Sequence, residues 1–271
     1  MTIIKKLLLA ALVLGSVITL QGCALYDNFS LNQDEASAVE ENLMETRTLL
    51  RRANVGVNVE YKSDGSWIPG SGGSEGESQG SGVVFHKTDD HYYALTNFHV
   101  VDPQDYDEVN VIVVPSMEDA EIDANVVASD EDRDLVILRF NRDDHDIGVL
   151  DMSLSVYEAM TQKEMLLAVG NPSAVNSIVT FGQYHGMVDT DDVDFKVIYH
   201  SALIYPGNSG GALANMDGYL VGINTWGVSG EPERNLAVPL DEIYVFLENE
   251  GFIDSEDDDD TDNVETARII D

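Results

Sequence analysis

The chain is poor in basic residues. Lysine and arginine together number 14 against 50 aspartate and glutamate residues, which gives a formal net charge of −36. Only six lysines occur, and Lys5 and Lys6 stand at the extreme N-terminus. A surface this acidic repels phosphate backbones, which argues against a nucleic-acid partner. Two explanations of the charge stay open: a hydrated surface typical of a marine or salt-tolerant bacterium, or an acidic face with a function.

Cysteine is also nearly absent, because Cys23 is the only one. No internal disulfide can form. No spacing of histidine, aspartate and glutamate resembles a metal-ligand set, and we expect neither a metal nor a cofactor. Hydrophobic residues make up 44% of the 271 residues, which is ordinary for a globular protein. This length can bury one large core or two small ones.

Long apolar runs are missing. The longest one, Leu7–Leu20, has 14 residues, whereas about 20 are needed to span a bilayer. Because two lysines precede this run, it is typical of a secretory signal peptide. Cys23 follows closely, with Leu20 and the small Gly22 before it. This stretch resembles a bacterial lipoprotein signal, in which the chain is cut before the cysteine and the thiol is acylated.

The lipoprotein resemblance implies that residues 1–22 are removed and that Cys23 anchors the mature chain to a membrane through acyl groups. Ala24 follows the cysteine, and by the same resemblance this implies the periplasmic face of an outer membrane. A Gram-positive cell surface and an ordinary signal peptide with an incidental cysteine are the alternatives.

The mature chain is dominated by short β-rich runs. Residues 35–53 suggest a short amphipathic helix, and we interpret 23–53 as a polar spacer. Residues 68–82 are rich in glycine and serine and predict a flexible loop. Expected strands lie at 55–61, 83–85, 92–95, 109–114, 135–140, 165–169, 177–181, 197–200 and 220–223.

One helix is expected near the C-terminus. Ile243, Phe246 and Leu247 recur with helical spacing within Leu240–Asn249. Residues 253–271 are strongly acidic and predict a disordered tail. Many short strands with one terminal helix predict an all-β sandwich or a pair of barrels.

The segment Tyr205–Leu213 carries the sharpest chemical signal. Glycines surround Ser209, so the backbone can turn tightly and leave the hydroxyl accessible. Consecutive N–H groups in such a turn can converge on an oxyanion. The pattern Gly-x-Ser-x-Gly also fits the nucleophile elbow of α/β-hydrolases. In those enzymes the catalytic histidine follows the serine, but here no histidine lies beyond His200.

The base and the acid must therefore come from upstream. His99 closes an apolar run and precedes another apolar pair, whereas His86, His91 and His145 lie among charges and turns. Asp134 leads directly into the apolar run Leu135–Leu138, and a buried carboxylate is what a catalytic triad requires. Asp130 and Asp132 are its nearby competitors, but they lie in a charged turn.

Several motifs in order resemble the trypsin-like serine proteases of the bacterial HtrA/Deg group, from about residue 55 to 247. They are Gly80–Val84, Leu95–Val101, Asp134–Leu138, Gly170–Pro172, Gly207–Leu213, Gly222–Thr225 and Ala237–Pro239. The resemblance implies two perpendicular six-stranded β-barrels, over 54–148 and 149–252 with the C-terminal helix. It covers the protease domain only, so regulation by the PDZ domains of better-known members is not implied.

The same resemblance assigns roles to individual residues. Ser209 is the nucleophile, His99 its base and Asp134 the residue that orients the base. The N–H groups of Gly207 and Ser209, with Asn208 nearby, form the oxyanion hole. Pro206 either presets this loop or hinders its remodelling.

A substrate pocket follows from the resemblance as well. Leu203 and Ile204 lie at its base, and Thr225, Trp226 and Gly227 form one wall. Because the pocket base holds no carboxylate, we expect cleavage after small or medium apolar residues and not after Arg or Lys.

These inferences predict an endopeptidase of the cell envelope that acts on unfolded or exposed protein segments. A homotrimer of protease domains is compatible with the resemblance. Two alternatives remain: a catalytically silent lipoprotein with a trypsin-like fold that binds peptides, and a structural lipoprotein whose acidic tail binds cations or basic partners.

Overall fold

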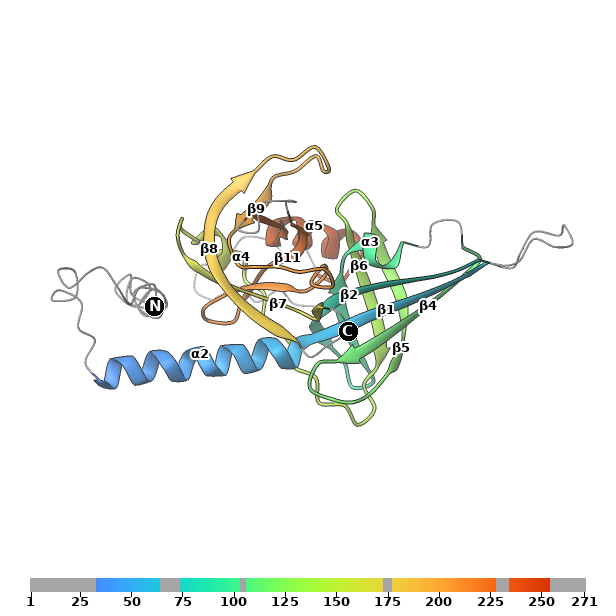
Figure 1. The fold of residues 1–271 in the computed structure, drawn as a ribbon, viewed down its shortest axis with the longest axis horizontal. Helices are drawn as coiled ribbons and strands as arrows, with labels where there is room; N and C mark the ends of the chain where they lie inside the picture. Colours follow the sequence, from blue (N-terminus) through green and yellow to red (C-terminus); the bar gives the residue numbers. More distant parts are fainter. Residues whose placement is uncertain (1–32, 64–73, 103–105, 173–176, 228–233, 254–271) are drawn as a thin grey trace, which may run out of the picture.

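In the computed structural model, the chain forms two closed antiparallel barrels of six strands each, which lie side by side (Figure 1). The structure describes residues 33–63, 74–102, 106–172, 177–227 and 234–253. The strand order is β1-β2-β3-β6-β5-β4 in the first barrel and β10-β11-β12-β9-β8-β7 in the second. The predicted all-β fold with two six-stranded barrels and a C-terminal helix is confirmed.

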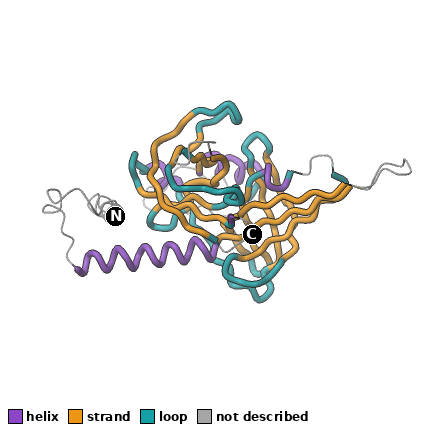
Figure 2. The backbone as a smooth tube through the Cα atoms, viewed as in Figure 1, coloured by secondary structure: helices purple, strands orange, loops and turns teal. Residues whose placement is uncertain are grey.

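Strands are more abundant than helices in the described chain (Figure 2). The first barrel consists of β1 (Asn54–Ser63), β2 (Ser74–Lys87), β3 (His91–Thr96), β4 (Glu108–Pro115), β5 (Ile122–Asp130) and β6 (Leu135–Asn141). The second consists of β7 (Met165–Gly170), β8 (Ile178–Val188), β9 (Val197–His200), β10 (Ala212–Asn215), β11 (Leu220–Gly227) and β12 (Asn235–Pro239). The helices are α2 (Gln33–Ala53), α3 (Phe98–Val101), α4 (Leu154–Glu158) and α5 (Leu240–Asn249).

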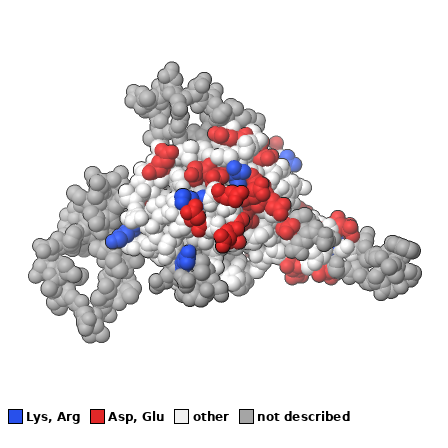
Figure 3. Space-filling view, turned by 90° about the horizontal axis from the view of Figure 1, so that it is seen from above, with Lys and Arg blue, Asp and Glu red and all other residues white. Residues whose placement is uncertain are grey.

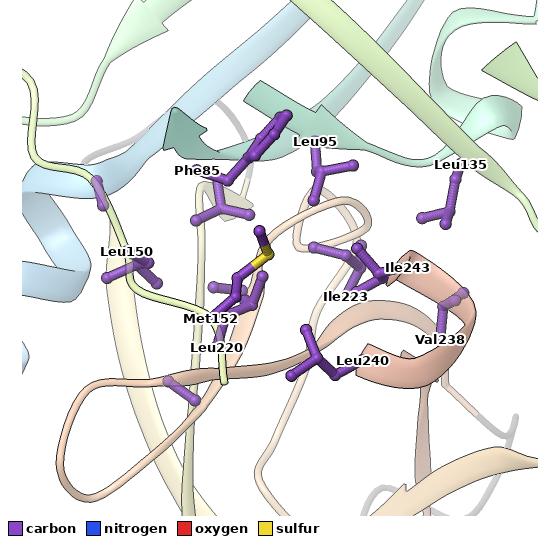
Figure 4. Close-up of a cluster of buried hydrophobic side chains, with 14 of the residues drawn as sticks. Phe85, Leu95, Leu135, Leu150, Met152, Leu220, Ile223, Val238, Leu240 and Ile243 are labelled. Carbon is purple, nitrogen blue, oxygen red and sulfur yellow. The ribbon is translucent and has the colours of Figure 1, made fainter. Parts of the chain in front are cut away.

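The two barrels are joined by a shared apolar core, part of which is drawn in Figure 4. Its labelled members are Phe85, Leu95, Leu135, Leu150, Met152, Leu220, Ile223, Val238, Leu240 and Ile243. Strand β6 shows why its sequence is continuously apolar. Leu135 and Ile137 pack in this shared core, whereas Val136 and Leu138 pack in the interior of the first barrel. Burial on both faces removes the usual polar alternation, and it fixes the two barrels against each other.

Helix α2 is an integral part of this assembly and not a spacer, so the interpretation of 23–53 is corrected for its helical part. Leu50 and Ala53 are fully buried in the shared core. Thr46 Oγ1 donates to the carbonyl oxygen of Met216 in the second barrel at 3.1 Å. The polar face of the helix hid this role in the sequence, because a few apolar residues suffice for a helix that packs along one narrow stripe.

The structure differs from the predicted strands in two ways: part of the expected loop is a strand, and three strands lie where the sequence predicted none. Residues 74–82 of the expected loop belong to β2, where they pair with β1 from Ser74↔Ser63 to Gly82↔Val55. Backbone hydrogen bonds form this pairing without need of apolar side chains. Strands β5, β10 and β12 were not expected, and β5 is largely exposed on the outside of its barrel.

Several other predictions lie outside the described residues. They are the signal at 1–22, the anchor at Cys23, the loop residues 68–73 and nearly all of the acidic tail. Among the described residues, none of the helices has the length and apolar character needed to cross a membrane.

Candidate active site

The predicted nucleophile follows a tight turn between β9 and β10. The N–H of Asn208 donates to the carbonyl oxygen of Tyr205 at 2.9 Å, with Pro206 and Gly207 at the two central positions. Gly207 has φ of 95°, as required at the third position of a type II turn, and proline suits the second. Of the two roles considered for Pro206, this placement matches the presetting one.

Two backbone donors lie on either side of Asn208. In the described part of the chain, neither the N–H of Gly207 nor that of Ser209 donates to another protein atom. Both residues are half-buried. The N–H of Asn208, which we expected near the oxyanion, is occupied by Tyr205 and is therefore not an available donor. The candidate oxyanion hole thus reduces to Gly207 and Ser209.

Gly210 explains why glycine follows the nucleophile. Its φ is 85°, and an added Cβ would lie 2.1 Å from the carbonyl oxygen of Ser81 and 2.3 Å from Thr96 Oγ1. The loop that carries Ser209 therefore lies directly against the first barrel. A side chain at position 210 would push the nucleophile away from that barrel.

The first barrel supplies the predicted base and acid. His99 lies in α3, directly after β3, and Asp134 lies in the turn before β6. His99 Nδ1 is 2.8 Å from Asp134 Oδ2 and 3.0 Å from Oδ1, while the His99 backbone N–H donates to Oδ1 at 2.9 Å. With the proton on Nδ1 held by the carboxylate, Nε2 is left as the basic nitrogen. The His99 side chain is 46% exposed and that of Asp134 only 10%.

Thr225 has a role that the sequence reasoning missed. Its hydroxyl donates to Asp134 Oδ2 at 2.6 Å, so its side chain supports the predicted acid, and its place in the pocket wall stays a prediction. Its carbonyl oxygen accepts the hydroxyl of Ser209 at 3.2 Å. In the described chain, the Ser209 hydroxyl donates to Thr225 and not to His99. The spacing of the motif Gly222–Thr225 gives no sign that the Thr225 hydroxyl reaches across to the other barrel.

Competing residues lie elsewhere. Asp130 Oδ2 pairs with Arg133 Nη1 at 2.8 Å, and Arg133 also contacts Glu242 at 3.0 Å. His145 pairs with Glu118 at 2.5 Å. The structure therefore brings together His99, Asp134 and Ser209 from two barrels, and it uses Asp130 and His145 in separate ion pairs.

The predicted pocket residues divide into two groups. Gly227 and Ile204 bound a common space, because a Cβ added to Gly227 would lie 3.8 Å from Ile204 Cγ1. The same Cβ would lie 3.5 Å from Oδ1 of Asn235, the residue paired with Gly227 across β11 and β12. Asn235 is buried, and its Nδ2 donates to the carbonyl oxygen of Ala202 at 3.0 Å. Sequence reasoning overlooked Asn235, since only strand pairing brings it opposite Gly227.

Leu203 and Trp226 are less clearly pocket residues. The carbonyl oxygen of Leu203 accepts the Thr180 hydroxyl at 2.7 Å, and both Leu203 and Trp226 are half-buried. Trp226 pairs with Leu236 at a bulge in β11. Their side chains stay predictions for substrate contact.

Acidic side chains gather on the face shown in Figure 3, where few lysines or arginines accompany them. The predicted pocket residues Ile204 and Gly227, by contrast, carry no charge. The acidic side chains on this face contrast with the uncharged residues Ile204 and Gly227 that we predict for the pocket.

Comparison with known proteins also indicates a trypsin-like peptidase domain. A family model described as "Trypsin-like peptidase domain" matches residues 80–223, more than half of the chain. The chain is similar to a "Serine protease HtrA-like" of Staphylococcus aureus (strain MRSA252), with 26% identity over 86% of this chain and 32% of the relative. It is also similar to "Serine protease HTRA2, mitochondrial" of Drosophila persimilis, with 31% identity over 42% of this chain and 27% of that protein. The chain thus spans about a third or less of these curated relatives.

The fold is also similar to solved structures of an HtrA-type protease. The HtrA-type protease AlgW with a decapeptide superimposes with a TM-score of 0.61 and 25% identity, covering 76% of this chain and 66% of that one. AlgW with a tripeptide gives a TM-score of 0.59 at 25% identity, over 76% and 63% of the two chains. By family match and by fold, the chain belongs to the trypsin-like peptidase domain family, and the relatives to which it is similar are serine proteases of the HtrA type.

Proposed function

We propose that the chain is an active serine endopeptidase that uses Ser209, His99 and Asp134. The observation that carries this proposal is the contact of Asp134 with both His99 Nδ1 and the Thr225 hydroxyl. This arrangement holds the imidazole with Nε2 free to accept a proton, as a triad requires.

The proposed reaction has two halves. Ser209 Oγ attacks the carbonyl carbon of the scissile peptide bond while His99 Nε2 takes its proton, and the oxyanion accepts hydrogen bonds from the N–H groups of Gly207 and Ser209. His99 then gives the proton to the leaving amine, and an ester with Ser209 remains. In the second half, water attacks the ester carbonyl carbon while His99 Nε2 takes its proton. The bond from that carbon to Ser209 Oγ then breaks, His99 returns the proton to Ser209 Oγ, and the acid product leaves.

A fluorophosphonate probe tests this function directly. We expect the mature protein to be labelled on Ser209, and we expect Ser209→Ala to abolish labelling. His99→Ala should slow labelling by at least about 10³-fold, because loss of a triad member removes activation of the hydroxyl. A matched control is His91→Ala, which removes a half-buried histidine far from the triad contacts and should leave labelling unchanged.

One observation favours a second candidate, a catalytically silent protein that binds peptides. The Ser209 hydroxyl donates to Thr225 and must turn toward His99 before it can attack. The silent candidate predicts peptide binding without cleavage and no labelling of Ser209 at any pH or with any peptide present. Labelling that appears only when a peptide is added would instead indicate an enzyme that peptides activate.

The proposed specificity is cleavage after small or medium apolar residues such as Ala, Val or Leu. The uncharged pocket residues support it, as does Asn235, whose buried side chain bounds the space in front of Gly227. A peptide library should give dominant cleavage after these residues, and Asn235→Gly should raise kcat/KM for Phe relative to Ala. Dominant cleavage after Arg or Lys would overturn the proposal.

The proposed setting is the cell envelope, with a lipid anchor at Cys23 and unfolded or exposed protein segments as substrates. The support is the sequence alone: the apolar run, the residues around Cys23 and Ala24 after it. The periplasmic face of the outer membrane and a homotrimer belong to the same proposal. Metabolic labelling with a fatty acid tests the anchor, and Cys23→Ser should abolish that labelling and release the protein from membranes.

A further inference from the structure

We propose that Ser81, on β2 of the first barrel, is a positioning residue that holds the oxyanion turn of the second barrel in place. This inference rests on the proposed endopeptidase function, but Ser81 itself contacts neither the reacting atoms nor His99. Instead it contacts the turn at two points, one on each side of Asn208.

The two contacts are short and buried. Ser81 Oγ donates to the carbonyl oxygen of Gly207 at 2.6 Å, and the Ser81 backbone N–H donates to the carbonyl oxygen of Ser209 at 2.8 Å. Ser81 is fully buried. Gly207 and Ser209 are the two residues whose N–H groups form the candidate oxyanion hole. A single residue therefore fixes the peptide groups next to both donors.

A network of hydrogen bonds orients the Ser81 hydroxyl. It accepts the backbone N–H of Asn171, which follows β7, at 2.8 Å. Asn171 Oδ1 in turn accepts Asn54 Nδ2 at 2.8 Å and the Ser116 hydroxyl at 3.1 Å. Because the Asn171 N–H occupies a lone pair of Ser81 Oγ, the hydroxyl proton points to Gly207. The motifs Gly80–Val84 and Gly170–Pro172 thus meet at the oxyanion turn.

The same residue connects the turn to the base. The carbonyl oxygen of Ser81 accepts the Thr96 hydroxyl at 2.7 Å, and Thr96 ends the strand that leads to His99. The nucleophile and the base come from different barrels, and a misplacement of about 1 Å can cost roughly 10²-fold in rate. Ser81 places the oxyanion turn relative to the barrel that carries His99.

The structure of the turn shows why an external contact matters. Gly207 has no Cβ, so its φ of 95° is only one of several accessible conformations. Within the turn, the Asn208 N–H bond to Tyr205 holds one end of the peptide group between Gly207 and Asn208. The Ser81 hydroxyl holds its other end. Loss of that hydroxyl removes the hydrogen-bond partner of the half-buried Gly207 carbonyl and of the buried Asn171 N–H.

Ser81→Ala tests the inference, because it removes the hydroxyl and keeps the backbone bond to Ser209. With a fluorogenic peptide carrying Val before the cut, we expect kcat to fall roughly 10- to 100-fold and KM to stay within about twofold. The inhibition constant of a peptide boronate with the same side chain, whose tetrahedral adduct uses the oxyanion hole, should rise by a similar factor. A purely structural role would lower the melting temperature without this split.

Ser153→Ala is the matched control. Ser153 is 1% exposed and its hydroxyl accepts the N–H of Val156 at the start of α4, away from the turn. The Ser153→Ala protein should have a lower melting temperature than the wild type but an unchanged kcat and an unchanged affinity for the boronate. If Ser81→Ala behaves like Ser153→Ala in both measurements, the inference about Ser81 is wrong. If the wild type and Ser153→Ala themselves fail to cleave or to be labelled, the proposed function fails instead.

If Ser81→Ala does not fold, Ser116→Ala tests the same inference, because Ser116 is connected to Ser81 by hydrogen bonds through Asn171. It removes one of the two donors to Asn171 Oδ1 and leaves Asn54 in place. We expect a weaker boronate affinity by about 2- to 5-fold with little change in KM. An unchanged affinity in that variant would overturn the inference.

Discussion

Asp134 has a backbone conformation that few residue types accept. Its φ is 54°, in the left-handed region, which aspartate tolerates better than most side chains. The conformation places its carboxylate beside the backbone N–H and the ring of His99, while Asn97 Nδ2 donates to its carbonyl oxygen at 2.9 Å. The proposed acid of the triad is thus fixed through both its main chain and its side chain.

Thr225 should be required for full activity. Thr225→Val keeps the size of the side chain but removes the hydroxyl that Asp134 Oδ2 accepts, so the buried carboxylate loses a hydrogen bond. A hydrogen bond to a charged group contributes about 1.5–3 kcal/mol, and we expect kcat/KM to fall by roughly 10-fold or more. The measurement is kcat/KM on a peptide together with the melting temperature.

The conservative change provides the control. Thr225→Ser keeps the hydroxyl and should retain kcat/KM within about threefold of the wild type. Wild-type kinetics in Thr225→Val would show that the contact with Asp134 does not support catalysis.

His200 predicts a dependence of stability on pH that the triad does not explain. The side chain is fully buried, and burial lowers its pKa from 6.5 to about 3, with the nearby His185 adding to the effect. Between pH 6.5 and 3 the unfolded chain binds a proton at this residue that the folded chain does not. Stability therefore falls as the pH falls through this window, by up to about 1.4 kcal/mol per pH unit.

Urea unfolding at pH 6.5 and pH 4.5 measures this contribution. His200→Leu removes the titrating group, and the loss of stability between the two pH values should shrink by roughly 2–3 kcal/mol relative to the wild type. His91→Leu serves as the control for loss of a histidine at a half-buried site. Parallel pH dependence in the wild type and His200→Leu would contradict the prediction.

At the scale of elements, α2 joins the two barrels. Its buried residue Leu50 belongs to the core that both barrels share, and Thr46 reaches the second barrel. Leu50→Ala should lower the free energy of unfolding by about 2–5 kcal/mol, the usual cost of a cavity at a fully buried leucine. Denaturant unfolding of the mature protein is the measurement.

Met44→Ala is the matched control on the same helix. Met44 is 55% exposed, and its truncation should change the free energy of unfolding by no more than about 0.5 kcal/mol. If Leu50→Ala is as mild as Met44→Ala, α2 does not stabilise the barrels and the spacer interpretation returns.

The strands show how far local pattern reasoning reaches. β6 and β7 were predicted well because they are apolar on both faces, and α5 was predicted with its observed bounds because its apolar residues repeat with helical period. β12 was missed because residues 235–239 are only five long and follow a polar stretch. Their pairing with both β9 and β11 creates the strand, and that pairing is long-range.

At the scale of the whole molecule, the net charge of −36 predicts a response to salt. Self-repulsion destabilises the compact state, and salt shortens the Debye length from about 30 Å at 0.01 M to about 3 Å at 1 M. We expect the melting temperature to rise when sodium chloride increases from about 10 mM to about 500 mM.

Sucrose at equal osmolality distinguishes screening from general stabilisation by cosolutes. With sodium chloride, most of the rise in melting temperature should occur below about 200 mM, where the Debye length changes most. With sucrose, the rise should not be concentrated in this low range. A melting temperature that does not change between the two salt concentrations would show that the acidic residues are too far apart, or too well hydrated, to repel each other.

The sequence alone was enough to predict the trypsin-like family and the all-β fold, and it points to His99, Asp134 and Ser209 as the candidate triad. It could do so because glycine-rich turns and apolar runs are local features, and because their order along the chain is specific. The contacts that join these residues arise only when the chain folds. Thr225, Ser81 and Asn235 act across strands or across the two barrels. No local pattern encodes such contacts, since a hydroxyl or an amide gains its role from the group that folding brings within hydrogen-bond distance.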